Sequence, residues 1–138
     1  MTVKAIVTED IKAYSLISLR GAREDDPDNI YLQANLKDRN PDLYATKDLK
    51  EGDEVFINIE GRPVWQVRLS NDVRPGAMIS AEDNGEARMT SPLLHKQYLG
   101  FTIEGGKAGD VVKYVRKTGV LEQTLDGDLE GLIDDEEV

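Results

Sequence analysis

Apolar side chains alternate with polar ones in three stretches of the chain, at residues 54–59, 65–70 and 98–103. A period of two, carried by β-branched and aromatic residues, is typical of strands that bury one face. The side chains predicted to share the inner faces are Val55, Ile57 and Ile59, then Trp65, Val67 and Leu69, then Leu99, Phe101 and Ile103.

Helical patterning is almost absent. No window of twelve or more residues places apolar side chains at helical spacing. Ser91 followed by Pro92 is suited to cap a single turn, because proline is tolerated where the first helical N–H needs no partner. The sequence therefore predicts an all-β fold with at most one short helix.

Glycine-containing turns precede the predicted strands and repeat along the chain. The turns at residues 49–55, 73–79 and 107–112 each lead into a strand that closes at a second glycine, nine, nine and ten residues after the first. A weaker fourth copy lies at residues 11–17. Glycine tolerates positive φ, and pairs such as Asn84-Gly85 form tight hairpins.

Hairpin units of this size cannot bury their apolar faces alone, so they must close on one another. We therefore expect a compact β-barrel or sandwich built from Gly-punctuated hairpins over residues 1–123. Residues 124–138 are rich in Asp and Glu and hold no basic residue, which predicts a mobile or partner-ordered acidic tail. Residues 36–48 read as an irregular connection.

Composition narrows the function. The net charge of −10 repels phosphate backbones, so a basic nucleic-acid-binding surface is not expected. The chain has no cysteine, which removes thiolate chemistry and Cys-ligated metal sites. No apolar stretch is long enough for a membrane span, and the N-terminus lacks the apolar segment of a signal peptide.

A search for catalytic residues finds no candidate. His95 is the only histidine, and no serine sits in a nucleophile-elbow motif, so His95 is interpreted as an ordinary surface or strand-edge residue. Glycines form no phosphate-binding loop. Carboxylate pairs are too numerous to single out one of them. We expect no enzymatic activity and no cofactor.

One metal-binding pattern stands out in the acidic tail. Asp126, Asp128, Glu130 and Glu137 occupy positions 1, 3, 5 and 12 of a calcium loop, with Gly131 at position 6. A glutamate at position 5 is larger than usual, and a chain ending one residue after Glu137 lacks the second flanking helix. A solvated acidic tail explains the same residues, so no metal site is assigned.

Two aromatic residues interrupt the alternation of their strands. Phe56 lies between Val55 and Ile57, and Tyr31 lies between Ile30 and Leu32. An aromatic side chain on an outer face is typical of a subunit interface. A covered outer face explains them equally well, and both interpretations remain open.

The order of these turns and strands resembles one protein family. A Gly-led strand at residues 76–79, a hairpin at 84–85, a Leu-Gly-Phe strand at 99–101 and an Ala-Gly-Asp strand at 108–115 look like capsid decoration proteins of tailed bacteriophages, also called cement or head-fibre proteins. The resemblance covers about residues 48–122. Similar turns occur in other small barrels, and no Met-Lys hairpin of a biotinyl carrier is present.

The resemblance implies a virion structural protein, made in the host cytoplasm, that binds the outside of the assembled major capsid protein shell and stabilises it. It further implies self-association, often as a homotrimer. The N-terminal strand (Thr2, Val3, Lys4 and onward to Val7) is expected to add to a capsid sheet edge, and residues 36–48 are a second candidate. With Tyr31 and Phe56, these are the predicted contact residues.

Two other classes remain. The first is a non-enzymatic cellular β-barrel adaptor whose acidic tail binds a basic partner. The second is a hydrolase or isomerase with an unrecognised carboxylate site, which would need a cleft that the sequence does not indicate.

Overall fold

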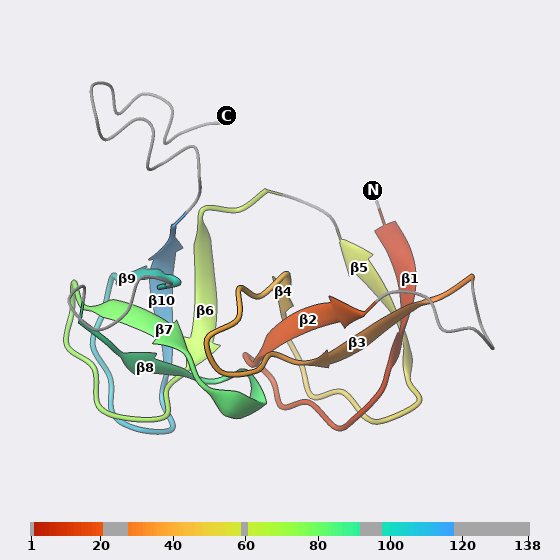
Figure 1. Cartoon of the computed structure of the whole chain (residues 1–138), viewed down its shortest axis with the longest axis horizontal. Coiled ribbons are helices and arrows are strands. Elements are labelled where there is room, and N and C mark those ends of the chain that lie inside the picture. The colour runs from red at the N-terminus through yellow and green to blue at the C-terminus, as the bar shows by residue number, and fades with distance from the viewer. Residues whose placement is uncertain (1, 21–27, 59–60, 92–97, 118–138) are drawn as a thin grey trace.

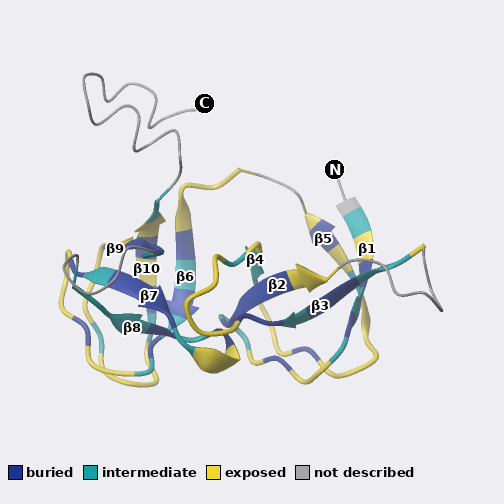
Figure 2. Ribbon diagram, viewed as in Figure 1, coloured by how far each residue is buried: buried dark blue, intermediate teal, exposed yellow. Residues whose placement is uncertain are grey.

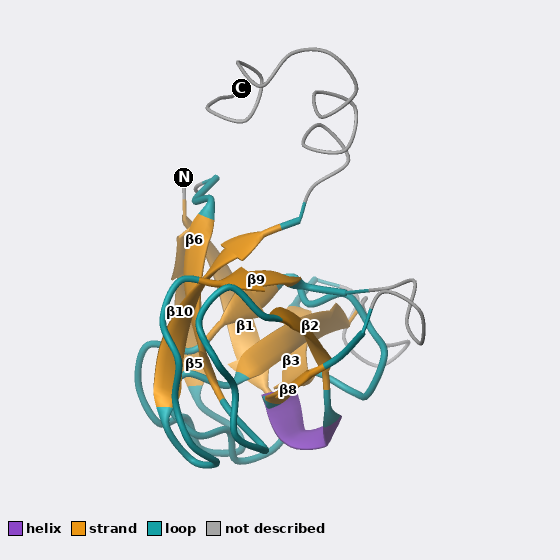
Figure 3. Ribbon diagram, turned by 90° about the vertical axis from the view of Figure 1, so that its left-hand side faces the viewer, coloured by secondary structure: helices purple, strands orange, loops and turns teal. Residues whose placement is uncertain are grey.

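Ten strands form nearly all of the regular structure in the part of the chain that the structure describes. The computed structural model describes residues 2–20, 28–58, 61–91 and 98–117 (Figure 1). Within these residues η1 (Asp83–Gly85), a 3-10 turn, is the single helical element (Figure 3). The predicted all-β fold is therefore confirmed. The strands are β1 (Thr2–Val7), β2 (Leu16–Arg20), β3 (Ile30–Ala34), β4 (Leu43–Tyr44), β5 (Glu54–Asn58), β6 (Val64–Arg68), β7 (Met78–Ala81), β8 (Ala87–Met89), β9 (Gly100–Thr102) and β10 (Val111–Arg116).

The strands divide into two five-stranded sheets that follow each other along the chain. The first has the order β4-β2-β3-β1-β5 and the second the order β6-β10-β9-β7-β8. Figure 1 shows the two sheets side by side, so that each half of the sequence forms its own unit. We call the described residues between 2 and 58 the N-terminal unit and those between 61 and 117 the C-terminal unit.

Positive φ angles occur at the predicted strand starts. Gly52 (φ +89°), Gly76 (φ +70°) and Gly109 (φ +91°) each lie two positions before the first residue of β5, β7 and β10. Tyr14, with φ +63°, takes the same place before β2. All four repeated turns expected from the sequence are therefore present, and in the fourth a tyrosine accepts the backbone conformation that glycine adopts freely.

The two units share one strand plan. Antiparallel pairing of β1 with β5 matches that of β6 with β10, β2 with β3 matches β7 with β8, and β2 with β4 matches β7 with β9. The isolated bridges Ile11–Leu49 and Val73–Gly106 are equivalent as well. By these pairings residues 7–19 align with 69–81, residues 30–35 with 85–90, and residues 43–58 with 100–115.

Equivalent hydrogen bonds occur at aligned positions. Val7 N–H donates to the Asp53 carbonyl at 2.9 Å, and Leu69 N–H donates to the Asp110 carbonyl at 2.8 Å. Each aspartate carboxylate in turn accepts the N–H three residues before it, from Lys50 in one unit and Lys107 in the other. Since turns, pairings and bonds coincide, the structure is an internal duplication.

The units differ in how their first and third strands meet. In the N-terminal unit, parallel pairing joins three residues of β1 to three of β3. In the C-terminal unit only the Leu69–Ala87 bridge remains, because η1 diverts the chain before β8. The C-terminal unit is therefore open between β6 and η1, and the N-terminal unit packs into this opening.

Two apolar cores result, coloured dark blue in Figure 2. One lies wholly in the N-terminal unit and the other lies in the C-terminal unit, except that the second also takes in Leu16 from β2. Leu16 is completely buried. A leucine of one unit thus completes the core of the other. Burying such a side chain contributes about 1.5–3 kcal/mol.

The structure narrows one sequence-based expectation and corrects another. β1 pairs with β5 from Thr2 to Ile6 but with β3 only from Ala5 to Val7, so Thr2–Lys4 have a strand partner on one side only among the described residues, and docking through this strand stays a prediction. In β9, Gly100 and Thr102 face inward while Phe101 is exposed, and Ile103 just beyond it is exposed too. The alternation there was assigned to the wrong face, although Leu99 is buried as expected.

Some expectations fall on residues outside those described. They are the short helix at residues 91–94 apart from Ser91, His95, the inward position of Ile59, the hairpin at Gly119 and the calcium pattern of the tail. The proposed division between residues 1–123 and 124–138 likewise remains a prediction.

Candidate interaction surfaces

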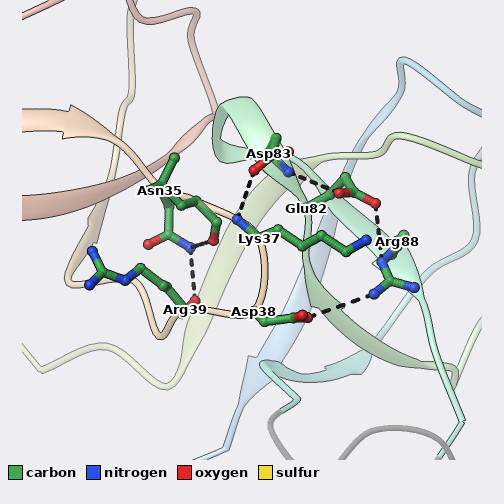
Figure 4. Close-up of polar contacts among 8 residues, drawn as sticks. Asn35, Lys37, Asp38, Arg39, Glu82, Asp83 and Arg88 are labelled. Carbon is green, nitrogen blue, oxygen red and sulfur yellow. Dashed lines mark hydrogen bonds and ion pairs between the residues drawn. The ribbon is translucent and has the colours of Figure 1, made fainter.

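The two units are joined by a polar network around Asn35, which is fully buried at the end of β3 (Figure 4). Its Nδ2 donates to the Arg39 carbonyl at 2.8 Å and to the Leu36 carbonyl at 3.3 Å, while its Oδ1 accepts from the Ser18 hydroxyl at 2.5 Å. Its own carbonyl accepts from Gly85 N–H at 2.9 Å. One side chain therefore shapes the loop after β3, and the same residue contacts η1.

The loop after β3 makes a hydrogen bond and an ion pair with the C-terminal unit. Lys37 N–H donates to the Asp83 carboxylate at 3.0 Å, and the Asp38 carboxylate lies 3.7 Å from the Arg88 guanidinium. Arg88 also pairs with Glu82 at 3.1 Å. Figure 4 shows these groups meeting from the loop after β3, the start of η1 and β8. The residue 36–48 connection, a candidate for capsid docking, thus partly serves as an internal joint.

The apolar part of the joint lies beside β6. Tyr44 and Trp65 are 5.4 Å apart between ring centroids, with planes tilted by 46°. Arg68 N–H donates to the Tyr14 carbonyl at 2.9 Å, so β6 finds a backbone partner in the other unit. Leu16 is the register partner of Tyr44, and its side chain belongs to the core of the C-terminal unit. Backbone bonding, ring contact and core burial together predict that the units behave as one rigid body.

A buried tyrosine and a half-buried arginine, Tyr114 and Arg116, lie near the C-terminal end of β10. Burial raises the pKa of the Tyr114 hydroxyl well above its usual range and lowers the pKa of the Arg116 guanidinium. The guanidinium carbon of Arg116 stands 3.8 Å from the centre of the Trp65 ring, a cation–π contact. Tyr114 is the register partner of Trp65, so the three side chains form one packed cluster between β10 and β6.

The outer surface of the N-terminal unit presents an aromatic residue at a sheet edge. Phe56 is 74% exposed, in β5, the last strand of its sheet. Lys4 lies directly opposite it in β1 and pairs with Glu54 at 3.4 Å. The structure thus brings together two of the residues predicted as contacts. An exposed ring on an unpaired strand edge is suited to receive a partner strand.

The other predicted contact residues are less accessible. Tyr31 is only 7% exposed, so the interpretation of a covered strand face applies to it. Val3 is partly buried in β1. Thr2 begins β1, and its side chain lies outside the described set.

A second apolar surface crosses the C-terminal unit. Met78, Phe101, Val115 and Val64 are consecutive register partners across β7, β9, β10 and β6. Phe101 is 42% exposed, Val115 39% and Val64 38%, and Ile103 flanks the row with 52% exposure. We call these five residues the outer row. Sequence analysis missed it because Phe101 and Ile103 were assigned to the core; the small inward residues Gly100 and Thr102 were the available signal.

Among the described residues no group of three or more His, Asp or Glu side chains could hold a metal ion. In the same part of the chain no helix is long and apolar enough to cross a membrane. What the structure offers is surface for binding: the β5 edge with Phe56, and the outer row.

The chain is similar in sequence to known proteins of bacteriophages. Residues 1–136 match a family described as head fiber protein. The head fiber protein of Bacillus phage Nf is 26% identical over 132 residues, covering 96% of this chain and 49% of the relative. The capsid fiber protein of Bacillus phage B103 is 25% identical over 108 residues, covering 78% of this chain and 37% of the relative. The chain thus spans about half or less of these relatives.

A solved structure has the same fold. The crystal structure of the head fiber gp8.5 N base in bacteriophage phi29 superposes with a TM-score of 0.75 at 24% identity. The match covers 85% of this chain and 93% of that one. The resemblance to phage capsid decoration and head-fibre proteins is confirmed, and with it the prediction of a virion structural protein: the chain belongs to the phage head fiber protein family.

Proposed function

We propose that this chain attaches to the outer surface of the assembled major capsid protein shell and stabilises it. The observation that carries the proposal is the family match over residues 1–136. No bond is made or broken in this role. The free energy comes from burying surface between neighbouring capsid subunits, and many symmetric copies multiply a modest affinity.

The β5 edge supports the docking side of the proposal. No second strand pairs with β5 within the described residues, whereas its counterpart β10 pairs with both β6 and β9. A capsid strand added to this edge would gain backbone hydrogen bonds, and the Phe56 ring beside Lys4 would provide a side-chain anchor. In this proposal β5 replaces β1 as the docking strand.

Purified shells that lack the protein test the attachment. The chain should bind them saturably, at a fixed ratio to the major capsid protein, and raise their melting temperature in calorimetry. Shells that neither sediment with the protein nor gain stability would refute it.

Matched variants locate the docking face. Phe56→Ser should weaken shell binding by about 30-fold, the size of a lost aromatic anchor of about 2 kcal/mol. Ile103→Ser, which changes an exposed apolar residue of the other unit, should bind like the parent. Equal effects of the two variants would remove the β5 edge from the proposal.

The homotrimer is the second part of the proposal, and it follows the family resemblance. Three copies at a local threefold position would each meet a different capsid subunit. Sedimentation equilibrium of the free chain and of chain released from shells measures this directly. A monomer in both samples would contradict it.

A further inference from the structure

The free edge of β5 corresponds to an edge that carries a strand in the C-terminal unit. β10, the counterpart of β5, pairs antiparallel with β9, and Val115 lies opposite Phe101 there. β4, the counterpart of β9, pairs with β2, and no pairing joins it to β5 in the described residues. The duplication therefore shows in one unit which kind of strand fits the edge that is open in the other.

One position separates β4 from β9. Gly100 of β9 lies so close to β10 that an added Cβ would overlap the Val115 carbonyl oxygen. The aligned residue of β4 is Leu43, by the equivalent pairings of β4 with β2 and of β9 with β7. The Leu43 side chain packs against the core of the N-terminal unit. A residue with a Cβ cannot make the approach that Gly100 makes, so β4 leaves the edge of β5 unpaired.

The backbone groups of β5 at this edge follow from its pairing with β1. Val7 N–H donates to the Asp53 carbonyl at 2.9 Å, and hydrogen-bonded pairs recur at every second residue of an antiparallel ladder. By this alternation the N–H and C=O groups of Phe56 and Asn58 point away from β1. In the C-terminal unit Lys113 aligns with Phe56, and its carbonyl accepts an N–H from the end of β9 at 2.9 Å.

We propose that β5 receives an antiparallel segment with the pattern glycine, apolar, small, apolar, supplied by the capsid protein if the proposed attachment holds. The pattern is that of residues 100–103 of this chain, Gly-Phe-Thr-Ile. The glycine approaches the Asn58 carbonyl. The two apolar residues lie opposite Asn58 and Phe56, and the small residue between them lies opposite Ile57.

The two faces of the edge account for this pattern. Thr102 is buried and Phe101 is exposed in β9, so a small side chain turns inward and an apolar one outward. Beside Phe56 the Lys4 ammonium lies 3.4 Å from the Glu54 carboxylate, so the charges on this face offset each other. An apolar strand therefore covers the exposed Phe56 ring without desolvating an unpaired charge.

A tethered peptide tests the pattern on the whole chain. The sequence has no cysteine, so Asn58→Cys gives a single thiol at the edge. The probe is a peptide of residues 98–104, Tyr-Leu-Gly-Phe-Thr-Ile-Glu, that carries Phe101→Cys. Opposed Cα atoms of a hydrogen-bonded antiparallel pair lie about 5.5 Å apart, which a disulfide can span.

Two control peptides separate the glycine and the register. One carries Gly100→Ala as well, and the other carries Thr102→Cys in place of Phe101→Cys. In a glutathione buffer the probe should form the disulfide about 10-fold more readily than either control, since an added Cβ or a shifted register forces backbone apart. The tethered probe should also protect the amide of residue 58 from hydrogen exchange and leave that of Ile57, already bonded to β1, unchanged.

Each outcome decides the proposal. Equal trapping of the three peptides, or trapping without protection of residue 58, overturns the pattern. If the chain still binds shells in that case, capsid attachment stands and only this inference fails. Selective trapping by a chain that ignores shells would refute the attachment and, with it, the capsid origin of the strand.

Discussion

Gly85 is the position where the junction between the units is most sensitive to a single atom. A Cβ at Gly85 would lie 2.5 Å from the Leu16 carbonyl oxygen, 2.8 Å from the Leu16 nitrogen and 2.8 Å from the Ser15 Cβ. Backbone atoms cannot rotate away, so η1 must separate from β2. Gly85→Ala should therefore open the joint as well as strain the turn, whose φ is +75°.

The cost follows from three parts. An alanine at positive φ costs about 1–2 kcal/mol, the hydrogen bond from Gly85 to Asn35 is worth about 1 kcal/mol, and partial exposure of Leu16 costs about 1–2 kcal/mol. Gly85→Ala should lower the free energy of unfolding by about 3–5 kcal/mol. Gly76→Ala is the control: its φ is +70°, but nothing lies within 4 Å of an added Cβ. It should cost only the strain of about 1–2 kcal/mol.

Urea denaturation followed by tryptophan fluorescence measures both variants. Trp65 is the only tryptophan, and it lies at the joint, so its emission reports both global unfolding and local opening. An earlier fluorescence transition than the circular-dichroism transition in Gly85→Ala would show that the units part before they unfold. If the two variants lose stability within about 0.5 kcal/mol of each other, the close approach at Gly85 contributes nothing and the reasoning fails.

Three further predictions use the same denaturation assay. Arg88→Ala should lower the free energy of unfolding by about 1 kcal/mol through the loss of two ion pairs, and by less in high salt. Lys4→Ala removes the exposed ion pair on β1 and should leave the free energy of unfolding within about 0.5 kcal/mol of the parent. Equal losses in the two variants would contradict a stabilising role of Arg88 at the junction. Asn35→Ala should cost about 2–3 kcal/mol, because it leaves buried partners without hydrogen bonds, and a neutral result would show that the loop holds its shape unaided. Burial raises the pKa of Tyr114 in the folded state, so the stability that the neutral hydroxyl contributes is complete below the unfolded pKa of about 10 and is lost as the pH rises above that value. Tyr114→Phe should therefore reduce the loss of stability at alkaline pH. If the loss is unchanged in this variant, other groups cause it.

Turn chemistry was the most predictable part of the fold. Glycines with positive φ mark the strand starts because few other residues adopt that conformation, so local sequence is enough to place Gly52, Gly76 and Gly109. Strand pairing was not predictable in the same way, since it joins segments far apart. The duplication escaped notice because its repeat lies in backbone bonds, while aligned side chains differ, as Tyr14 differs from Gly76.

The surfaces divide on the same physical ground. Phe56 was identified as an outer residue because it interrupts an otherwise regular alternation. Phe101 could not be identified as an outer residue in this way. Alternation divides a strand into two faces without showing which face is buried, and a phenylalanine is expected on the buried one. Tyr31 broke its pattern as Phe56 did, yet neighbouring elements cover it. Burial of this kind depends on tertiary packing.

The Leu16 that completes the second core also sets an order of events during synthesis. Leu16 and Tyr44 are translated before Trp65 and Gly85. At about 5–20 residues per second, the face of the N-terminal unit that holds Leu16 therefore stays uncovered for a time on the order of seconds. The C-terminal unit, in contrast, is translated after the N-terminal unit is complete. Its core can therefore form around a leucine that is already present.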